Sequence, residues 1–112
     1  MRSSELAIMN ELPFLFWAKD KDGTYVWGNK AINAFAGEDV TGKTDFELRW
    51  SKDADGLRAD DQKVWESGQP EFVHEIAGTP GFEASTLSVC KFIGELDGQR
   101  CVFGASFVIK GK

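Results

Sequence analysis

Cysteine, histidine, proline and positive charge are all scarce in this chain. Its 112 residues include two Cys, one His and three Pro, and its net charge is −5 at pH 7. A Ser or Cys nucleophile needs a histidine within hydrogen-bond reach, so a single histidine leaves little room for a catalytic triad. Two Cys and one His cannot complete a four-ligand zinc site. An acidic chain also lacks the basic field that attracts nucleic acids. We therefore expect neither a metal site nor a nucleic-acid partner.

Long apolar runs are missing as well. The sequence has no stretch of roughly 18 apolar residues and no signal peptide with a charged start and an apolar middle. We expect no membrane contact by this segment, although a membrane-anchored parent protein is compatible with that. No glycine loop ending in Lys-Ser or Lys-Thr is present, which argues against an intrinsic NTPase.

The two cysteines are expected to remain free thiols. Cys90 and Cys101 fall on two predicted strands that a tight turn at Asp97-Gly98 joins. With a two-residue loop Cys90 faces Ala105, and with a three-residue loop closed by a glycine bulge it faces Gly104. In neither register does it face Cys101, so no disulfide is expected. Free thiols suit a reducing compartment, and we expect a cytoplasmic location.

The sequence contains enough apolar residues to form one hydrophobic core. Apolar residues make up 42% of the chain, which includes nine Phe and four Trp. This composition excludes a disordered chain, and the length suits a single domain.

The pattern around which the chain is organised runs from residue 12 to residue 29. Two apolar runs, at 14–18 and 24–27, flank a polar connector that ends in Gly23, and this predicts a β-hairpin. Asn29 can then cap a short helix that stops at Gly37.

Three further helical segments are expected. Residues 3–11 predict a short N-terminal helix, and residues 41–48 predict a turn followed by a helical piece that Asp45 can cap. Residues 54–67 form the strongest helix and end before Gly68. Leu57, Val64 and Trp65 fall on one side of this helix, with Asp60, Asp61 and Glu66 mostly on other sides.

Three strands follow this helix. Residues 70–77 alternate Phe72, His74 and Ile76 with polar or smaller positions, which is typical of a half-buried strand. A break is expected at 78–81, and residues 82–94 and 100–109 predict two longer strands.

The order of strand, Asp-Gly turn, strand, Asn and short helix resembles the opening of a PAS domain, the sensor module of bacterial signalling proteins. The resemblance continues through the segment 41–48, the acidic helix and the three later strands. It implies an α+β fold in which short helices and one longer helix cover one face of a five-stranded antiparallel sheet. It also implies an N-terminal flanking helix at 1–12 and a PAS domain at 13–110.

The resemblance places a ligand pocket between the sheet and the helices. Alternation puts Trp17 and Lys19 on one face, and Ser88 and Cys90 together on one face of a later strand. Whether Ser106 joins that second set depends on the loop register, since a three-residue loop includes it and a two-residue loop does not. We take the pocket candidates to be Trp17, Lys19, Trp27, Asp45, Trp65, His74, Ser88, Cys90 and Ser106.

No cofactor is identified by the sequence, and haem and flavin are both disfavoured. His74 on its strand could ligate iron, but a satisfied structural histidine is the preferred interpretation. PAS domains that bind haem usually carry the axial histidine on the helical side, and residues 54–67 contain none. The related light sensors carry Asn-Cys-Arg-Phe-Leu-Gln where this chain has residues 43–48, which lack the reactive cysteine. The remaining interpretations are that the pocket binds a colourless small molecule or that it binds no ligand.

The implied function is sensing within a larger bacterial signalling protein, such as a histidine kinase, a diguanylate cyclase or phosphodiesterase, or a chemoreceptor. A ligand in the core, a homodimer through the N-terminal helix and the outer sheet face, or both, would pass a signal to a linked output domain. The alternative is a homodimerisation module without a ligand. We expect no catalysis by this domain; loss of turnover on replacing His74 would revive the enzyme hypothesis.

Overall fold

The computed structural model describes residues 1–77 and 85–110 of the chain. The break predicted at 78–81, and the beginning of the strand predicted from residue 82, lie outside the described residues.

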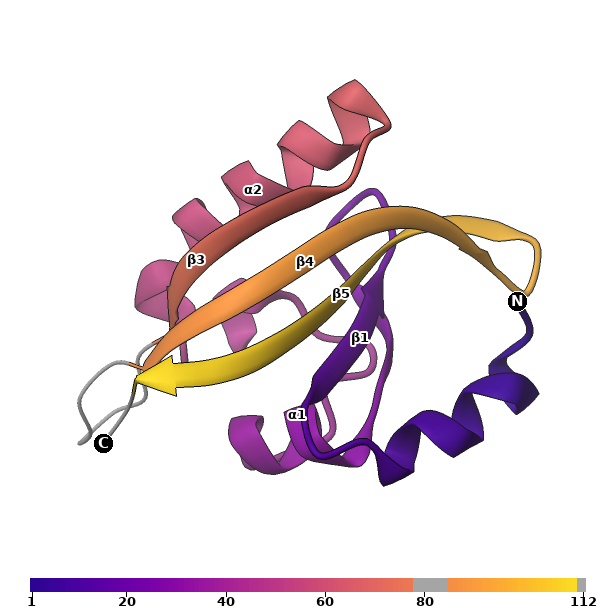
Figure 1. The fold of residues 1–112 in the computed structure, drawn as a ribbon, viewed down its shortest axis with the longest axis horizontal. Helices are drawn as coiled ribbons and strands as arrows, with labels where there is room; N and C mark the ends of the chain where they lie inside the picture. Colours follow the sequence, from indigo (N-terminus) through magenta and orange to yellow (C-terminus); the bar gives the residue numbers. More distant parts are fainter. Residues whose placement is uncertain (78–84, 111–112) are drawn as a thin grey trace.

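The described residues form a five-stranded antiparallel sheet, as the sequence predicts. The order across the sheet is β2-β1-β5-β4-β3, so the last strand in the sequence lies in the middle (Figure 1). The strands are β1 (Leu15–Lys19), β2 (Tyr25–Gly28), β3 (Glu71–Ala77), β4 (Ser85–Leu96) and β5 (Gln99–Lys110).

The helical segments also follow the predicted order. α1 begins after Asn29, whose Oδ1 accepts a hydrogen bond from the Ile32 N–H at 3.1 Å. α1 and α2 end at Gly37 and Gly68, both in the left-handed conformation. The segments are η1 (Ser3–Glu11), α1 (Lys30–Ala36), η2 (Asp45–Glu47), η3 (Ser51–Asp53) and α2 (Ala54–Ser67). Among the described residues, no helix is long and apolar enough to cross a membrane.

The turn between β4 and β5 settles the register that the sequence leaves open. Leu96 pairs with Gln99, so the loop has two residues, Asp97 and Gly98. Their φ angles are 51° and 83°, and this pair of left-handed residues matches the twist of a β-hairpin. Cys90 therefore faces Ala105. Both cysteines are free thiols, as expected.

Two apolar clusters cover the two faces of the sheet. On the inner face, side chains of β1 and β4 pack with residues of α1 and α2, including Ile32 and Leu57. On the outer face, Leu6 of η1 is fully buried against Phe16, Ala18 and Phe103. Figure 1 shows η1 starting beside the β4–β5 turn and running away from it. The N-terminal helix therefore covers part of the outer face.

Asp61 on α2 lies on a different side of the helix from the one predicted. It is fully buried together with Leu57 and Val64, which are four and three residues away. A carboxylate is tolerated there because two lysine ammonium groups from the sheet reach it.

Candidate functional site

The inner face of the sheet and the helices line a small cavity, called the inner cavity here. Its walls are mostly aromatic and aliphatic, and they include Trp17, Tyr25, Phe35, Trp50 and Leu57. Its free volume is about 20 Å³, which is room for roughly one water molecule. Charged side chains from Lys19, Glu75 and Lys91 complete the lining.

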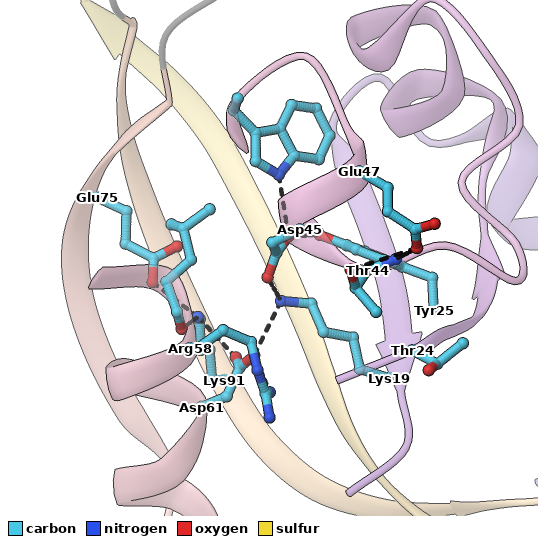
Figure 2. Close-up of polar contacts among 12 residues, drawn as sticks. Lys19, Thr24, Tyr25, Thr44, Asp45, Glu47, Arg58, Asp61, Glu75 and Lys91 are labelled. Atoms are coloured by element: carbon cyan, nitrogen blue, oxygen red, sulfur yellow. Dashed lines mark hydrogen bonds and ion pairs between the residues drawn. The ribbon is translucent and has the colours of Figure 1, made fainter. Parts of the chain in front are cut away.

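Lys19 reaches the inner cavity from β1 and joins two carboxylates. Its Nζ donates to Asp45 Oδ2 at 2.6 Å and to Asp61 Oδ2 at 2.8 Å, and it lies 4.8 Å from the centre of the Tyr25 ring (Figure 2). Asp45 Oδ1 accepts two more hydrogen bonds, from the Tyr25 hydroxyl at 2.7 Å and from Trp50 Nε1 at 2.9 Å. Asp45 therefore joins η2, the hairpin and the segment before η3.

Lys91 extends the network to the other edge of the sheet. Its Nζ donates to Asp61 Oδ1 at 2.8 Å and to the Leu57 carbonyl at 3.3 Å, and it lies 2.7 Å from Glu75 Oε2. Arg58 adds a contact of 3.2 Å to Asp61 from the partly exposed side of α2. Asp61 thus binds three cations at once, and Figure 2 shows it at the centre of the network.

Burial and these contacts act on the pKa values in opposite directions. Burial raises the pKa of Glu75 to about 7 from 4.5, and Lys91 only partly opposes this. Burial would also raise the pKa of Asp61, but Lys19 and Lys91 outweigh it and hold that pKa below its ordinary value. Burial, helped by Asp45, raises the pKa of Tyr25 well above 10.0. Glu75 is therefore the member of the network that changes its charge near neutral pH.

Two buried polar groups on the inner face have neither a hydrogen-bond partner nor an ion-pair partner among the described residues. They are Trp17 Nε1 and Ser106 Oγ, on side chains that are 4% and 0% exposed. Because an unpaired buried donor costs free energy, such groups are expected to meet a water molecule or a ligand. The site can thus offer unused hydrogen bonds inside an aromatic cavity.

A family model of the PAS fold matches residues 9–105. The chain belongs to the PAS family. No curated protein matches it. PAS domains are sensory modules, and the predicted family and fold are both confirmed.

Solved PAS structures have the same fold at low sequence identity. The PAS domain of an HTR-like protein from Haloarcula marismortui is 21% identical with a TM-score of 0.74, and the match covers 96% of this chain and 91% of that one. The PAS domain of nitrogen regulation protein NR(II) from Vibrio parahaemolyticus is 13% identical with a TM-score of 0.73, covering 94% and 97%.

A third similar structure comes from a longer protein. VqmA bound to DPO is 20% identical with a TM-score of 0.81, and the match covers 96% of this chain and 57% of that one. A second VqmA structure is that of the Vibrio cholerae protein. This PAS chain spans only about half the length of the VqmA chains it matches.

The structure brings four of the nine candidate residues of this PAS domain together on its inner side. Trp17 and Lys19 line the inner cavity, Asp45 binds Lys19, and Ser106 is buried on the same face. Trp65 on α2 lies apart from them, in a surface groove beside the β1–β2 turn.

The other four candidates lie on the outer face. They are Trp27, His74, Ser88 and Cys90. His74 is exposed and points away from the inner cavity, because Val73 and Glu75 occupy the inward positions of β3. The sequence pattern suggested the opposite orientation, since Phe72 and Ile76 appear more apolar than Glu75. The ion pair with Lys91 explains how Glu75 can point inward.

Sequence reasoning missed six hydrogen-bonding or charged residues of the site, which are Tyr25, Trp50, Arg58, Asp61, Glu75 and Lys91. A signal existed for Asp61, because it stands four residues after Leu57 and three before Val64, within the apolar stripe of the helix. Lys91 gave a similar signal, since it follows Leu87 and Val89 at the next position on the same face of β4. Charges at core positions of both elements indicate pairing across the core.

Proposed function

We propose that this chain is the sensory part of a larger bacterial signalling protein and that it binds a small molecule in the inner cavity. In this proposal residues 13–110 are the PAS domain and residues 1–12 are its flanking helix. The observation that carries it is the unpartnered Nε1 of Trp17, which is buried in an aromatic cavity beside the Lys19 network. A ligand there would contact β1, β4 and α2 together, and could shift their packing.

The parent protein is proposed to be a histidine kinase, a cyclic-dinucleotide enzyme or a chemoreceptor. The PAS domain of a two-component sensor histidine kinase, 8% identical, is among the similar structures and supports the first of these. VqmA, a longer protein that contains a domain of this fold, has a structure bound to DPO, which supports a ligand-binding role. The domain itself is proposed not to be an enzyme, since His74 lies on the outer face, away from the buried charges. Its net charge of −5 disfavours direct contact with nucleic acid.

The experiment is mass spectrometry under native conditions on the domain purified from cells without added ligand. A mass above that of the chain, lost on denaturation and lost in Trp17→Phe, supports the proposal. Phe has no N–H, whereas the control Trp27→Phe changes a tryptophan on the outer face. An absorption spectrum of the same sample tests the cofactor proposal, which is a colourless molecule rather than haem or flavin. A bare chain mass that extracts of the cells do not change would contradict ligand binding.

A second candidate function, homodimerisation, is favoured by apolar side chains left uncovered on the outer face. Phe72 is 79% exposed and Phe107 is 52% exposed, and the Phe107 ring packs against Phe14 at a tilt of 41° with ring centres 4.6 Å apart. Ile8 on η1 adds an apolar side chain that is 69% exposed. A second copy of the domain would bury this surface.

Light scattering over a concentration series tests this candidate. The expected result is a dimer in which Phe72→Ser and Phe107→Ser each weaken association. Phe46→Ser is the matched control, because Phe46 is 55% exposed but stands on η2. A monomer at all concentrations, or equal weakening by the control, would rule out the outer-face dimer.

A further inference from the structure

Leu57 of α2 and Glu75 of β3 each line two separate spaces. One space is the inner cavity. The other is a surface groove between α2 and β3, called the outer groove here, which has a volume of about 480 Å³. The outer groove is also lined by Lys52, Asp60 and His74. Leu57 and Glu75, together called the partition, are thus the side chains that both spaces share.

The volumes show why the partition matters for a ligand. Small-molecule sites in proteins usually measure about 300 to 1,000 Å³. The inner cavity, at about 20 Å³, falls far short of that range, whereas the outer groove falls within it. The unused hydrogen-bond donor of Trp17 lies on the inner side. A molecule larger than water can therefore reach Trp17 from the outer groove only if the partition moves aside.

The charges around the inner cavity indicate the ligand's own charge. Among residues 1–77 and 85–110, the network joins three cations, Lys19, Arg58 and Lys91, to three carboxylates, Asp45, Asp61 and Glu75. With Glu75 ionised these charges cancel. A charged ligand would enter without a counter-charge, and a buried unpaired charge is costly. The unpaired Trp17 Nε1 can donate a hydrogen bond to an acceptor on the ligand, and a planar molecule can pack against the aromatic walls.

We propose that the inner cavity and the outer groove are two chambers of one ligand site, separated by the partition of Leu57 and Glu75, and that its ligand is an uncharged planar molecule carrying a hydrogen-bond acceptor. This inference rests on the proposed sensory function and specifies its ligand class and the route of access. Glu75 then has two roles, since it closes the partition through Lys91 and sets the net charge that the ligand meets.

Protonation of Glu75 alters both roles. Burial raises its pKa to about 7, so below neutral pH the network carries one net positive charge and an anion becomes acceptable. The other ionisable groups around Glu75, on α2, β4, β1, β2, η3 and its own strand, are Asp60, Asp61, Lys91, Lys19, Tyr25, Lys52, Asp53 and His74.

The test uses three probes of one shape and three charges: benzamide, benzoate and benzamidinium. Each is titrated into the intact uniformly labelled chain near pH 8, about one unit above the pKa of Glu75. The indole N–H of Trp17 in the proton–nitrogen correlation spectrum reports arrival in the inner cavity, and the His74 amide reports the outer groove. Benzamide is expected to shift both signals and to bind at least about tenfold more tightly than either ion.

Two pairs of variants test the partition. Leu57→Ala opens it, so the benzamide affinity should rise at least about threefold because more of the population is competent to bind. Val64→Ala, a buried residue of α2 outside both linings, should leave the affinity unchanged. Glu75→Gln gives the network one net positive charge and should shift preference toward benzoate. Glu71→Gln, on the same strand but outside both linings, should not.

The outcomes separate this inference from the proposed function. If benzamide shifts Trp17 but Leu57→Ala and Glu75→Gln bind like wild type, the ligand site stands and the partition is wrong. If benzoate or benzamidinium shifts Trp17 in wild type as strongly as benzamide near pH 8, the ligand class is wrong. If no probe shifts Trp17 in wild type or in Leu57→Ala, the two-chamber site is wrong. If Leu57→Ala fails to fold, Leu57→Val makes the same test with a smaller truncation of the side chain.

Discussion

The indole of Trp17 lies directly over Gly104, its neighbour across the β1–β5 pairing. A methyl group on Gly104 would come within 2.8 Å of Trp17 Nε1 and still closer to two ring carbons. Glycine is the residue that lets the indole lie against β5 and line the inner cavity.

Gly104→Ala is therefore expected to push the indole off the strand and distort the inner cavity. The free energy of unfolding should fall by about 1 to 3 kcal/mol, the usual cost of overpacking a core. Urea unfolding measures this loss, and tryptophan fluorescence reports the moved ring. Gly56→Ala is the control, because it lies in α2 with nothing within 4 Å and should add up to about 1 kcal/mol. A fully stable Gly104→Ala with unchanged fluorescence would contradict the packing described.

Asp45→Asn should be strongly destabilising. The substitution removes the charge that faces Lys19. The two carboxylate oxygens of Asp45 accept three hydrogen bonds, and asparagine keeps only one of these oxygens. Breaking one partner out of a buried ion pair costs about 3 to 5 kcal/mol, and we expect a loss in that range by urea unfolding. Asp39→Asn is matched to it: Asp39 is exposed and its Oδ1 accepts only from the Thr41 N–H among the described contacts. Equal effects of the two substitutions would argue against the buried network.

Asn29→Asp tests an amide that uses both ends of its side chain. The Oδ1 of Asn29 accepts from the N–H groups of Phe16 and Ile32, and its Nδ2 donates to the carbonyls of Met9 and Phe14. A carboxylate cannot donate, so it would face two carbonyl oxygens in a fully buried position.

The expected loss for Asn29→Asp is at least about 2 kcal/mol of unfolding free energy in thermal or urea unfolding. Asn10→Asp is the control, because within residues 1–77 and 85–110 the Asn10 side chain bonds through its oxygen alone, which accepts from the Lys30 N–H. A loss no larger than that of the control would show that the Nδ2 contacts contribute nothing to stability.

The pH dependence of stability should carry the signature of Glu75. Its pKa is raised in the folded state, so the folded chain holds this proton more tightly than the unfolded chain does. The stabilisation is complete below pH 4.5 and is lost as the pH rises through about 7. As the pH rises across this window, the free energy of unfolding of wild type should therefore fall relative to that of Glu75→Gln by up to about 3 kcal/mol.

Urea unfolding at a series of pH values measures that difference directly. Asp61 has a lowered pKa, so its own contribution changes on the acid side of this window and is shared by both proteins. Glu71→Gln should follow the wild-type curve. Parallel curves for wild type and Glu75→Gln would mean that Glu75 titrates normally.

Local chemistry made much of the fold predictable. α1 begins after Asn29 and ends at Gly37, and α2 ends at Gly68. These ends could be predicted because a helix cap depends on only a few neighbouring residues. The register of β4 and β5 was left open because Asp97-Gly98 fits a two-residue or a longer loop. The observed φ of Asp97 selects the shorter loop, and a sequence does not display that angle.

The site was predictable only in part, because its chemistry depends on pairs of residues far apart in the chain. Lys19 and Asp45 were found as candidates. Asp61 and Lys91 were missed because the burial of each charge depends on the other, 30 residues away in the chain. His74 was assigned inward because apolar residues flank it in alternation. Phe72 is instead exposed and Glu75 is buried, so the strand faces the other way.

The position of β5 in the middle of the sheet bears on how the chain emerges from the ribosome. β1 and β2 are synthesised first, yet among the described strands it is β5, the latest of the five, that joins them to β4 and β3. Until β5 appears, the nascent chain holds two half-sheets with unpaired edges, which are prone to aggregate or to bind chaperones. Folding of this domain is thus expected to wait until β5 has emerged from the ribosome.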